Sequence, residues 1–483
     1  MRQLTSLDAQ FLALESRRQS GHVGGLAILD PSTAPGGVLT IEDLKALLGE
    51  RAPLLPPLRW RLVEVPLGLD FPYWIDDGDF DIDFHVRELA LPSPGSDAQL
   101  AEQTARIMSR PLDRARPLWE VYLVHGLPSG HVAVLTKIHH ALIDGLSGAE
   151  IMGLLLDLTP EGRELPDAPP PEDEPGRDPS ELEMLGRGLL GLPRYPLRLL
   201  QSLPAAVPNI EETPLGVLPG AGTLGRLAKG LGHVLGGGNG SPERGSLVAP
   251  KTSFNGPVSP HRRFAFGQLA LEDVKKVKNE YSCTVNDVIV SMCAGAVRHW
   301  LIEHDELPEE PLVAQVPVSV RTTEQTGTYG NRILLMAAPL FTDMSDPVER
   351  LLRTHDALTV MKERYRALPA ELLQDANNFI PPAVFHRAAQ LTFRLSTSRP
   401  GRPTWNLVIS NVPGPQFPLY MAGAELKANY PVSVITDGMG LNLTVMSYCG
   451  HLDFGLVADR DQMPDLWNLM DWLAEELDVL LPS

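Results

Sequence analysis

The amino-acid sequence predicts an α/β protein made of two lobes, each built on a mixed sheet. Segments with the two-residue period of strands alternate with segments of helical period, and this alternation occurs on both sides of a Pro- and Gly-rich stretch. A chain of 483 residues is long enough for about two to four domains. We therefore predict a first lobe over residues 1–159, a crossover linker over 160–250 and a second lobe over 251–483.

The first lobe begins with a short helix that carries Phe11, Leu12 and Leu14, and either Ser6 or Asp8 is expected to cap it. The elements predicted after it are strands over 22–29, 80–89, 117–124 and 131–140, a helix over roughly 97–110, and a buried helix over 144–158. Gly24 and Gly25 in the first of these strands predict close packing of neighbouring chain.

The amino-acid composition of the linker changes along its length. Residues 160–179 contain seven prolines and many acids, whereas 187–210 and 213–242 contain no acid but hold leucines and basic residues. This stretch is too long for an ordinary loop inside a domain. Apolar, basic segments bind lipid surfaces, so we expect 187–242 to contact a membrane or droplet. The alternative is a crossover that packs over the lobes.

The second lobe repeats the alternation of strands and helices. Thr284 precedes a helix that extends to about Trp300. The other predicted elements are strands over 262–271, 312–320, 332–341 and 405–415, a helix over 346–366, a hairpin over 441–459 and a final helix with apolar positions from 466 to 480.

Composition and charge exclude several classes of protein. A hydrophobic fraction of 43% and a charged fraction of 21% exclude wholesale disorder. The net charge of −19 makes nucleic acid an unsuitable partner. No apolar run is long enough to span a membrane, and the first residues lack the pattern of a secretory signal. Three unpaired cysteines fit a reducing cytosol.

The densest group of reactive side chains is HHALIDG, His139 to Gly145, at the junction of a strand and a helix. Successive side chains of a strand point to opposite faces, so His139 and His140 are not expected to bind one metal ion. One of them is a candidate general base, and Asp144 holds a fixed charge at the following turn. The alternative is a pair of histidines at a strand end with Asp144 as a helix cap.

Motifs that would supply a nucleophile from the protein are missing from the sequence. There is no G-x-S-x-G elbow, no P-loop, no G-x-G-x-x-G after a strand and no H-E-x-x-H. A general base without its own nucleophile indicates that a hydroxyl or amine of the substrate makes the attack.

HHALIDG resembles the HHxxxDG signature of the chloramphenicol-acetyltransferase-like acyltransferases, which include condensation domains. SLDAQFLALE, HVGGLAIL, PLDRARPLWE, TVNDVIV, VPVSVR with GNR, and SNVPGP occur in the order found in the bacterial wax ester synthase/acyl-CoA:diacylglycerol acyltransferase family. The resemblance covers the chain outside about 160–250. It implies two chloramphenicol-acetyltransferase-like lobes and transfer of a fatty acyl group from acyl-CoA to a diacylglycerol or long-chain alcohol.

The resemblance also assigns roles to residues of the motif. His140 is the expected general base, His139 supports it, Asp144 is structural, and Gly145 lies at the substrate. It implies no cofactor and no metal, since acyl-CoA is a substrate. The implied location is the cytoplasm, peripherally on the inner membrane face or on lipid droplets.

The remaining motif residues have structural alternatives. Those expected to line the substrate are Pro117, Leu118, Trp119, Asn286, Ser410 and Asn411. Trp119 also suits a buried core, Asp287 suits a helix cap, and Asn411 suits a turn. Arg321, at the end of a strand in the second lobe, is the expected salt-bridge partner of Asp144, with Arg59 and Arg61 as competitors.

Two other functions stay open at this point. One is an amide-forming condensation domain, and the other is a lipid-binding or droplet-coat protein without catalysis. The sequence also leaves the acceptor, the acyl chain length, the contacts of the CoA phosphates, the oxyanion donors and the oligomeric state undecided.

Overall fold

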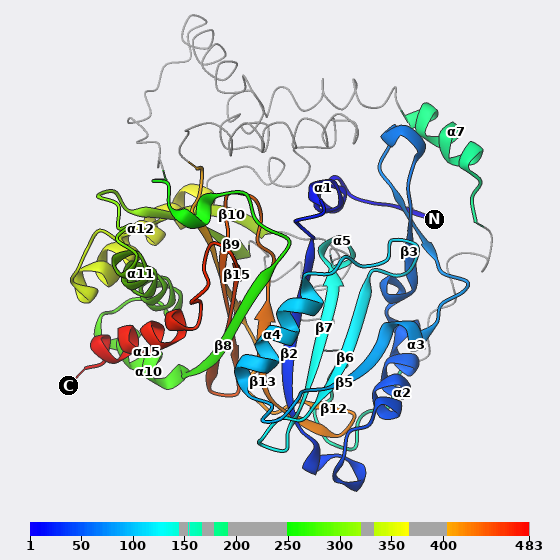
Figure 1. The fold of residues 1–483 in the computed structure, drawn as a ribbon, viewed down its shortest axis with the longest axis horizontal. Coiled ribbons are helices and arrows are strands. Elements are labelled where there is room, and N and C mark those ends of the chain that lie inside the picture. Colours follow the sequence, from blue (N-terminus) through cyan, green and yellow to red (C-terminus); the bar gives the residue numbers. More distant parts are fainter. Residues whose placement is uncertain are drawn as a thin grey trace, which may run out of the picture.

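Two six-stranded mixed sheets lie side by side and form two lobes (Figure 1). The computed structural model describes residues 1–143, 153, 155–166, 178–191, 249–319, 333–366 and 403–482. The predicted α/β class with mixed sheets is confirmed: β5 pairs in parallel with β6, and β11 in parallel with β9 and β14, while the other neighbours are antiparallel.

The first sheet has the order β12 (Tyr420–Met421), β13 (Ala424–Val432), β2 (His22–Asp30), β7 (Val132–His139), β6 (Trp119–His125) and β5 (Val86–Ala90). The second has the order β10 (Ile333–Leu340), β9 (Leu312–Ser319), β11 (Leu407–Pro413), β14 (Leu441–Tyr448), β15 (His451–Asp459) and β8 (Arg262–Ala270). A small third sheet joins β1 (Arg2–Gln3), β4 (Tyr73–Asp76) and β3 (Trp60–Val63).

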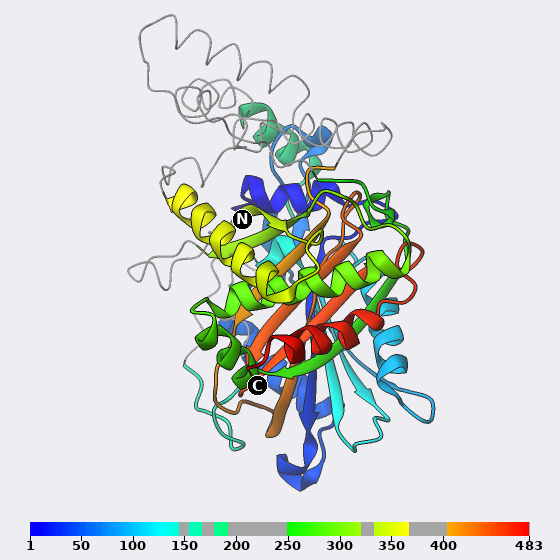
Figure 2. The ribbon, with the colours of Figure 1, turned by 90° about the vertical axis from the view of Figure 1, so that its left-hand side faces the viewer.

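Helices pack against both sheets, and α4 lies between the first sheet and β8. Near the first sheet lie α1 (Ser6–Leu14), α2 (Ile41–Arg51), α3 (Ile82–His85), α4 (Asp97–Met108), α5 (His140–Ile143) and α7 (Glu181–Gly191). Across the second sheet lie α10 (Leu271–Glu280), α11 (Val285–Glu303), α12 (Pro347–Arg366) and α15 (Asn468–Leu480), as Figure 2 shows. None of the helices in the described part of the chain is both long enough and apolar enough to cross a membrane.

Strand β13 connects the two lobes, and the sequence analysis did not predict it. It comes from the C-terminal half of the chain but pairs antiparallel with β2, with Leu426 opposite Leu29 and Val432 opposite Gly24. Its backbone also lies against β15 of the second sheet, because a Cβ on Gly455 would come within 1.8 Å of the Pro431 carbonyl oxygen. The first sheet is therefore completed by chain from beyond residue 400.

A hydrophobic cluster extends across the junction of the lobes. One buried cluster combines Leu26 and Tyr122 of the first sheet with Phe266 of the second and Tyr430 of β13. The rings of Phe266 and Tyr430 lie 4.6 Å apart between centroids. Aromatic contacts of this kind add to the free energy gained by burying the side chains.

Most predicted elements are confirmed, with two corrections. Helix α1 is capped by Thr5, whose hydroxyl accepts from the Asp8 amide while Asp8 bonds back to Thr5, so neither Ser6 nor Asp8 is the cap. The predicted strand over 80–89 is wrong in its first half, because Asp81 accepts from the Asp83 amide at 3.0 Å and starts helix α3. A local side-chain hydrogen bond competes there with the alternating pattern.

Close packing at the paired glycines is confirmed. A Cβ at Gly24 would lie 1.9 Å from the Thr136 carbonyl oxygen, and one at Gly25 would lie 2.6 Å from Asn429 Oδ1. The predicted helix over 144–158 falls mainly outside the described residues, as does most of the 160–250 linker.

Candidate active site

The two histidines of HHALIDG lie where β7 ends and α5 begins. His139 is the last residue of β7 and pairs with His22 of β2. The backbone N–H of His140 donates to the Gly21 carbonyl at 2.8 Å, and that of His139 donates to the Leu118 carbonyl at 2.9 Å. A Cβ at Gly21 would lie 2.9 Å from His139 Nε2, so only glycine leaves room for the ring.

The His139 ring is buried and held in one tautomer. The backbone N–H of Ala141 donates to its Nδ1 at 3.1 Å, so Nδ1 has the lone pair and Nε2 has the proton. Nε2 lies 3.1 Å from Glu15 Oε1. His22 Nε2 lies 3.7 Å from the same oxygen. Glu15 therefore faces two buried imidazoles.

The Glu15 carboxylate keeps its charge inside this site. Burial raises its pKa, but His139, Arg114 and the Gly21 amide outweigh burial and lower the pKa to about 2. Arg114 Nη2 donates to Glu15 Oε2 at 2.8 Å, and the Gly21 N–H donates to Oε1 at 3.0 Å. The sequence analysis did not single out Glu15 or Arg114. The available signal was their position in SLDAQFLALE and PLDRARPLWE.

His140 has a different environment from His139. Its side chain is half-buried, and its ring stacks on Phe11 of α1, with centroids 3.8 Å apart and planes 17° apart. The His140 ring therefore contacts α1 through Phe11, whereas the His139 ring contacts Glu15. Of the two histidines, the half-buried His140 is the one with solvent access.

His22 and Lys137 form the buried layer behind His139. Burial, together with the charge of Lys137, lowers the pKa of His22 to about 3. Burial also lowers the pKa of Lys137 to about 8. Lys137 donates to the carbonyls of Ile107 at 3.0 Å and Arg110 at 2.5 Å. Its ammonium thus binds the C-terminal end of α4, where a cation is favoured.

Two motif residues of the second lobe, Asn411 and Asn286, contact each other. Asn411 Nδ2 donates to Asn286 Oδ1 at 3.4 Å, which joins β11 to the first turn of α11. Ser410 precedes Asn411 and is half-buried. Asp287 is the buried capping residue expected from the sequence: its Oδ2 accepts from the Thr284 amide at 2.8 Å and lies 2.7 Å from His355 Nδ1.

The Pro117–Trp119 segment is buried. Trp119 is 2% exposed, its indole N–H donates to the Leu58 carbonyl at 2.7 Å, and its ring stacks on His85 at 4.4 Å. Together with the Leu118 carbonyl bonded to His139, these contacts place the segment in the core that supports the histidines. Asp144, Gly145 and Arg321 lie outside the described residues.

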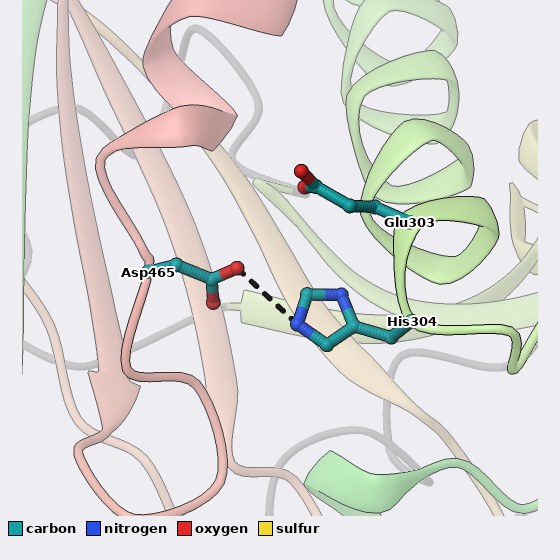
Figure 3. A group of neighbouring side chains, drawn as sticks. All are labelled: Glu303, His304 and Asp465. Carbon is teal, nitrogen blue, oxygen red and sulfur yellow. Dashed lines mark ion pairs between the residues drawn. The ribbon is translucent and has the colours of Figure 1, made fainter.

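One group of side chains in the described part of the chain has the spacing of metal ligands. Figure 3 shows Glu303, His304 and Asp465. His304 Nε2 lies 3.2 Å from Asp465 Oδ2, so an ion pair accounts for the contact. Glu303 is the last of the 19 residues of α11, about 26 Å along the helix from Asn286 at 1.5 Å per residue. This group is separate from the candidate active site.

The low pKa of His22 predicts acid sensitivity. The unfolded chain protonates His22 near 6.5 and the folded chain near 3. The contribution of neutral His22 is therefore complete above pH 6.5 and is lost as the pH falls towards 3, at up to about 1.4 kcal/mol per pH unit. We expect His22→Gln to flatten the fall in unfolding free energy between pH 6.5 and 4.5, measured by urea denaturation.

The matched control for this variant is exposed His451→Gln, which should keep the slope of the wild type. Equal slopes for His22→Gln and the wild type would contradict the prediction.

Comparisons with known proteins agree on the family. The wax ester synthase/diacylglycerol acyltransferase catalytic domain matches residues 4–289, and the C-terminal domain of the same family matches residues 329–481. A Mycobacterium tuberculosis protein classed as a diacylglycerol O-acyltransferase is 37% identical over 484 residues, covering 100% of this chain and 90% of its own.

Solved structures share the fold. The wax ester synthase/diacylglycerol acyltransferase of Marinobacter aquaeolei has a TM-score of 0.67 and 31% identity, covering 99% of this chain and 98% of its own. The starter condensation domain of rhizomide synthetase has a TM-score of 0.51 at 14% identity, over 99% of this chain and 94% of its own, and shows the fold alone. The chain therefore belongs to the wax ester synthase/diacylglycerol acyltransferase family and is an O-acyltransferase.

Proposed function

We propose that this enzyme transfers a fatty acyl group from acyl-CoA to the hydroxyl of a diacylglycerol or a long-chain alcohol. The observation that carries the proposal is the half-buried His140 at a strand–helix junction, next to a buried His139–Glu15 pair. The matched family and the names of its members support an O-acyltransferase acting on these acceptors.

The proposed chemistry is a direct transfer without an acyl-enzyme. The acceptor oxygen attacks the thioester carbonyl carbon while the His140 imidazole takes the hydroxyl proton. The tetrahedral intermediate then collapses, its C–S bond breaks, and the His140 imidazolium returns the proton to the CoA thiolate. Ester and CoA thiol are the products, so neither a metal nor a redox cofactor enters the balance.

The His139–Glu15 pair has a positioning role in this proposal. Glu15 is charged at neutral pH and its oxygen lies 3.1 Å from His139 Nε2, so it keeps His139 in the tautomer that accepts from Ala141. That hydrogen bond shapes the turn on which His140 sits. We keep Asp144 as a structural residue of the same turn and Arg321 as its proposed partner.

An acceptor-competition assay tests the proposed function. Thiol release from palmitoyl-CoA should depend on added hexadecanol or diolein, with wax ester or triacylglycerol separated by chromatography. Release with an amine acceptor alone would favour amide formation. Lipid binding without release for any acceptor would favour a protein that coats droplets.

His140→Ala should abolish transfer while the protein stays folded. Loss of a general base reduces turnover by about 10²–10⁴-fold, and the His140 side chain is only half-buried. The measurement is kcat for palmitoyl-CoA and hexadecanol, with circular dichroism as the check on folding. A folded variant with more than about a tenth of wild-type turnover would exclude His140 as the base.

Glu15→Gln should lower kcat at least about tenfold, since loss of a carboxylate that fixes the tautomer of an active-site histidine strongly reduces turnover. KM for either substrate should change less, because Glu15 holds His139 rather than the substrate. The matched control is Glu64→Gln, which removes an exposed carboxylate that also contacts Arg114, at 2.9 Å. Equal losses in the two variants would show that Arg114, and not the His139 tautomer, is responsible.

We also propose that α7 docks the enzyme on a lipid surface. One side of α7 packs on the loop around Leu69, since a Cβ on Gly188 would lie 2.7 Å from Val65 Cγ1 and 3.1 Å from Leu69 Cβ. The other side exposes Leu182, Leu189 and Leu190, with exposed fractions of 77%, 53% and 78%.

The loop that α7 contacts also exposes a leucine. Leu67 is 80% exposed and has a φ of 60°, a backbone conformation that is rare for leucine. The four exposed leucines thus belong to two neighbouring segments, and Figure 1 shows α7 at one end of the molecule.

Replacing Leu182, Leu189 and Leu190 with serine should weaken flotation with anionic vesicles. Inserting a leucine into lipid contributes about 1.5–3 kcal/mol when it is fully buried, so the partition coefficient should fall at least about tenfold. The matched control replaces exposed Leu352 and Val360 on α12 and Val479 on α15. Unchanged flotation of the α7 variant would overturn the docking proposal.

A further inference from the structure

A buried cation lies beneath the histidine turn. Lys137 is on β7, two residues before His139, so the two side chains point to the same face of the first sheet. Lys137 is 0% exposed and His139 is 1% exposed. Lysine is almost never buried to this extent unless its ammonium has partners, so the contacts of this ammonium indicate what the residue does.

The ammonium of Lys137 joins β7 to the end of α4. Its Nζ donates to the carbonyl oxygens of Ile107 at 3.0 Å and Arg110 at 2.5 Å. Ile107 is in the last turn of α4, and Arg110 lies two residues beyond the helix, where the helix dipole favours a positive charge. Ile107 also shares a buried apolar cluster with Leu135 of β7. The strand that ends in His139 is therefore held to α4 by charge-assisted hydrogen bonds as well as by apolar packing.

The acid nearest to Lys137 is shared with other side chains. Glu120 is opposite Lys137 on β6, and its Oε2 lies 3.8 Å from Nζ. The same oxygen accepts from the Tyr122 hydroxyl at 2.7 Å, and Oε1 lies 3.4 Å from Arg87 Nη2. The carbonyls at the end of α4 are thus the closer partners of the ammonium.

Burial makes the charge of Lys137 easy to remove. The charged and titratable groups around it are Glu120 and Tyr122 on β6, Arg87 on β5, Arg110 after α4, Glu15 after α1, His22 on β2 and His139 on β7. Burial, with the charges of Arg110 and Arg87, outweighs the two carboxylates and lowers the pKa of Lys137 to about 8. Lys137 therefore loses its proton at mildly alkaline pH.

We propose that Lys137 is a positioning residue of the acyl transfer, whose ammonium holds the end of α4 against β7 and so fixes the strand end that carries His139 and His140. The inference rests on the proposed function, because it assigns a support to the histidines of that reaction. A neutral amine would keep N–H donors, but hydrogen bonds without a charge are about half as strong. Its attraction to the helix end and to Glu120 would be lost as well. Alkaline pH therefore weakens this link and lowers turnover.

The pH dependence of kcat with palmitoyl-CoA and hexadecanol tests this role. Wild-type kcat should fall at least about fivefold between pH 7.5 and 9.5, with a midpoint close to the Lys137 pKa of about 8. Lys137→Arg, whose guanidinium stays charged, should lack this fall. Lys137→Met should have at least about fivefold lower kcat at pH 7.5 and no further alkaline fall, a result that tests the role even if arginine does not fit.

Stability measurements separate positioning from unfolding. The unfolded chain keeps the Lys137 proton to about pH 10.4, so the unfolding free energy of the wild type relative to Lys137→Met should rise between pH 8 and 10 while wild-type kcat falls. The matched control is Lys275, which is exposed on α10. Lys275→Arg and Lys275→Met should both keep the alkaline fall of the wild type.

Three results would overturn the inference. They are a flat wild-type profile, an alkaline fall that persists in both Lys137 variants, and a loss of turnover that follows unfolding in urea and circular dichroism. Failure of the proposed function is distinguishable, because the wild-type enzyme would then release no thiol from palmitoyl-CoA with an alcohol at any pH.

Discussion

The pairing of β13 with β2 is the constraint on which the rest of the structure depends. This strand belongs to the sheet of the first lobe but lies in the C-terminal half of the chain, against β15. The backbone N–H of Asn429 donates to the carboxylate of buried Asp453 on β15 at 2.7 Å. The contact between β13 and the second sheet therefore includes a hydrogen bond as well as apolar packing. Because one strand is shared, the lobes cannot separate without opening a sheet.

The second organising feature is a buried negative charge beside the histidines. Glu15 lies on the N-terminal segment, while its partners come from β7, β2 and the segment before β6. An isolated carboxylate would be costly to bury, and Arg114, the Gly21 amide and His139 offset that cost. The same contacts hold α1 over the turn, where Phe11 stacks on His140. Stability and geometry of the site thus depend on one set of contacts.

The sequence predicted the features that local patterns encode. Apolar segments of strand length predicted β2, β7, β8, β14 and β15, and apolar positions at helical spacing predicted α12 and α15. Thr284 with Asp287 identified the start of α11. The position of HHALIDG at a strand–helix junction was predicted in the same way, from the strand-like residues before the motif and the helix-like residues after it. The order of the motifs was enough to indicate the family.

Contacts between distant parts of the chain needed the tertiary structure. Glu15 and His139 are 124 positions apart, and only the pairing of β2 with β7 under α1 brings them to 3.1 Å. The same holds for Arg262 with Arg18, and for β13, whose partner strand lies about 400 residues earlier. The sequence by itself determined the α/β class, most of the elements and the identity of the histidine turn, because neighbouring residues encode them. The tertiary structure decided the contact between Glu15 and His139 and the shared strand β13, because each depends on which distant segments the fold brings together.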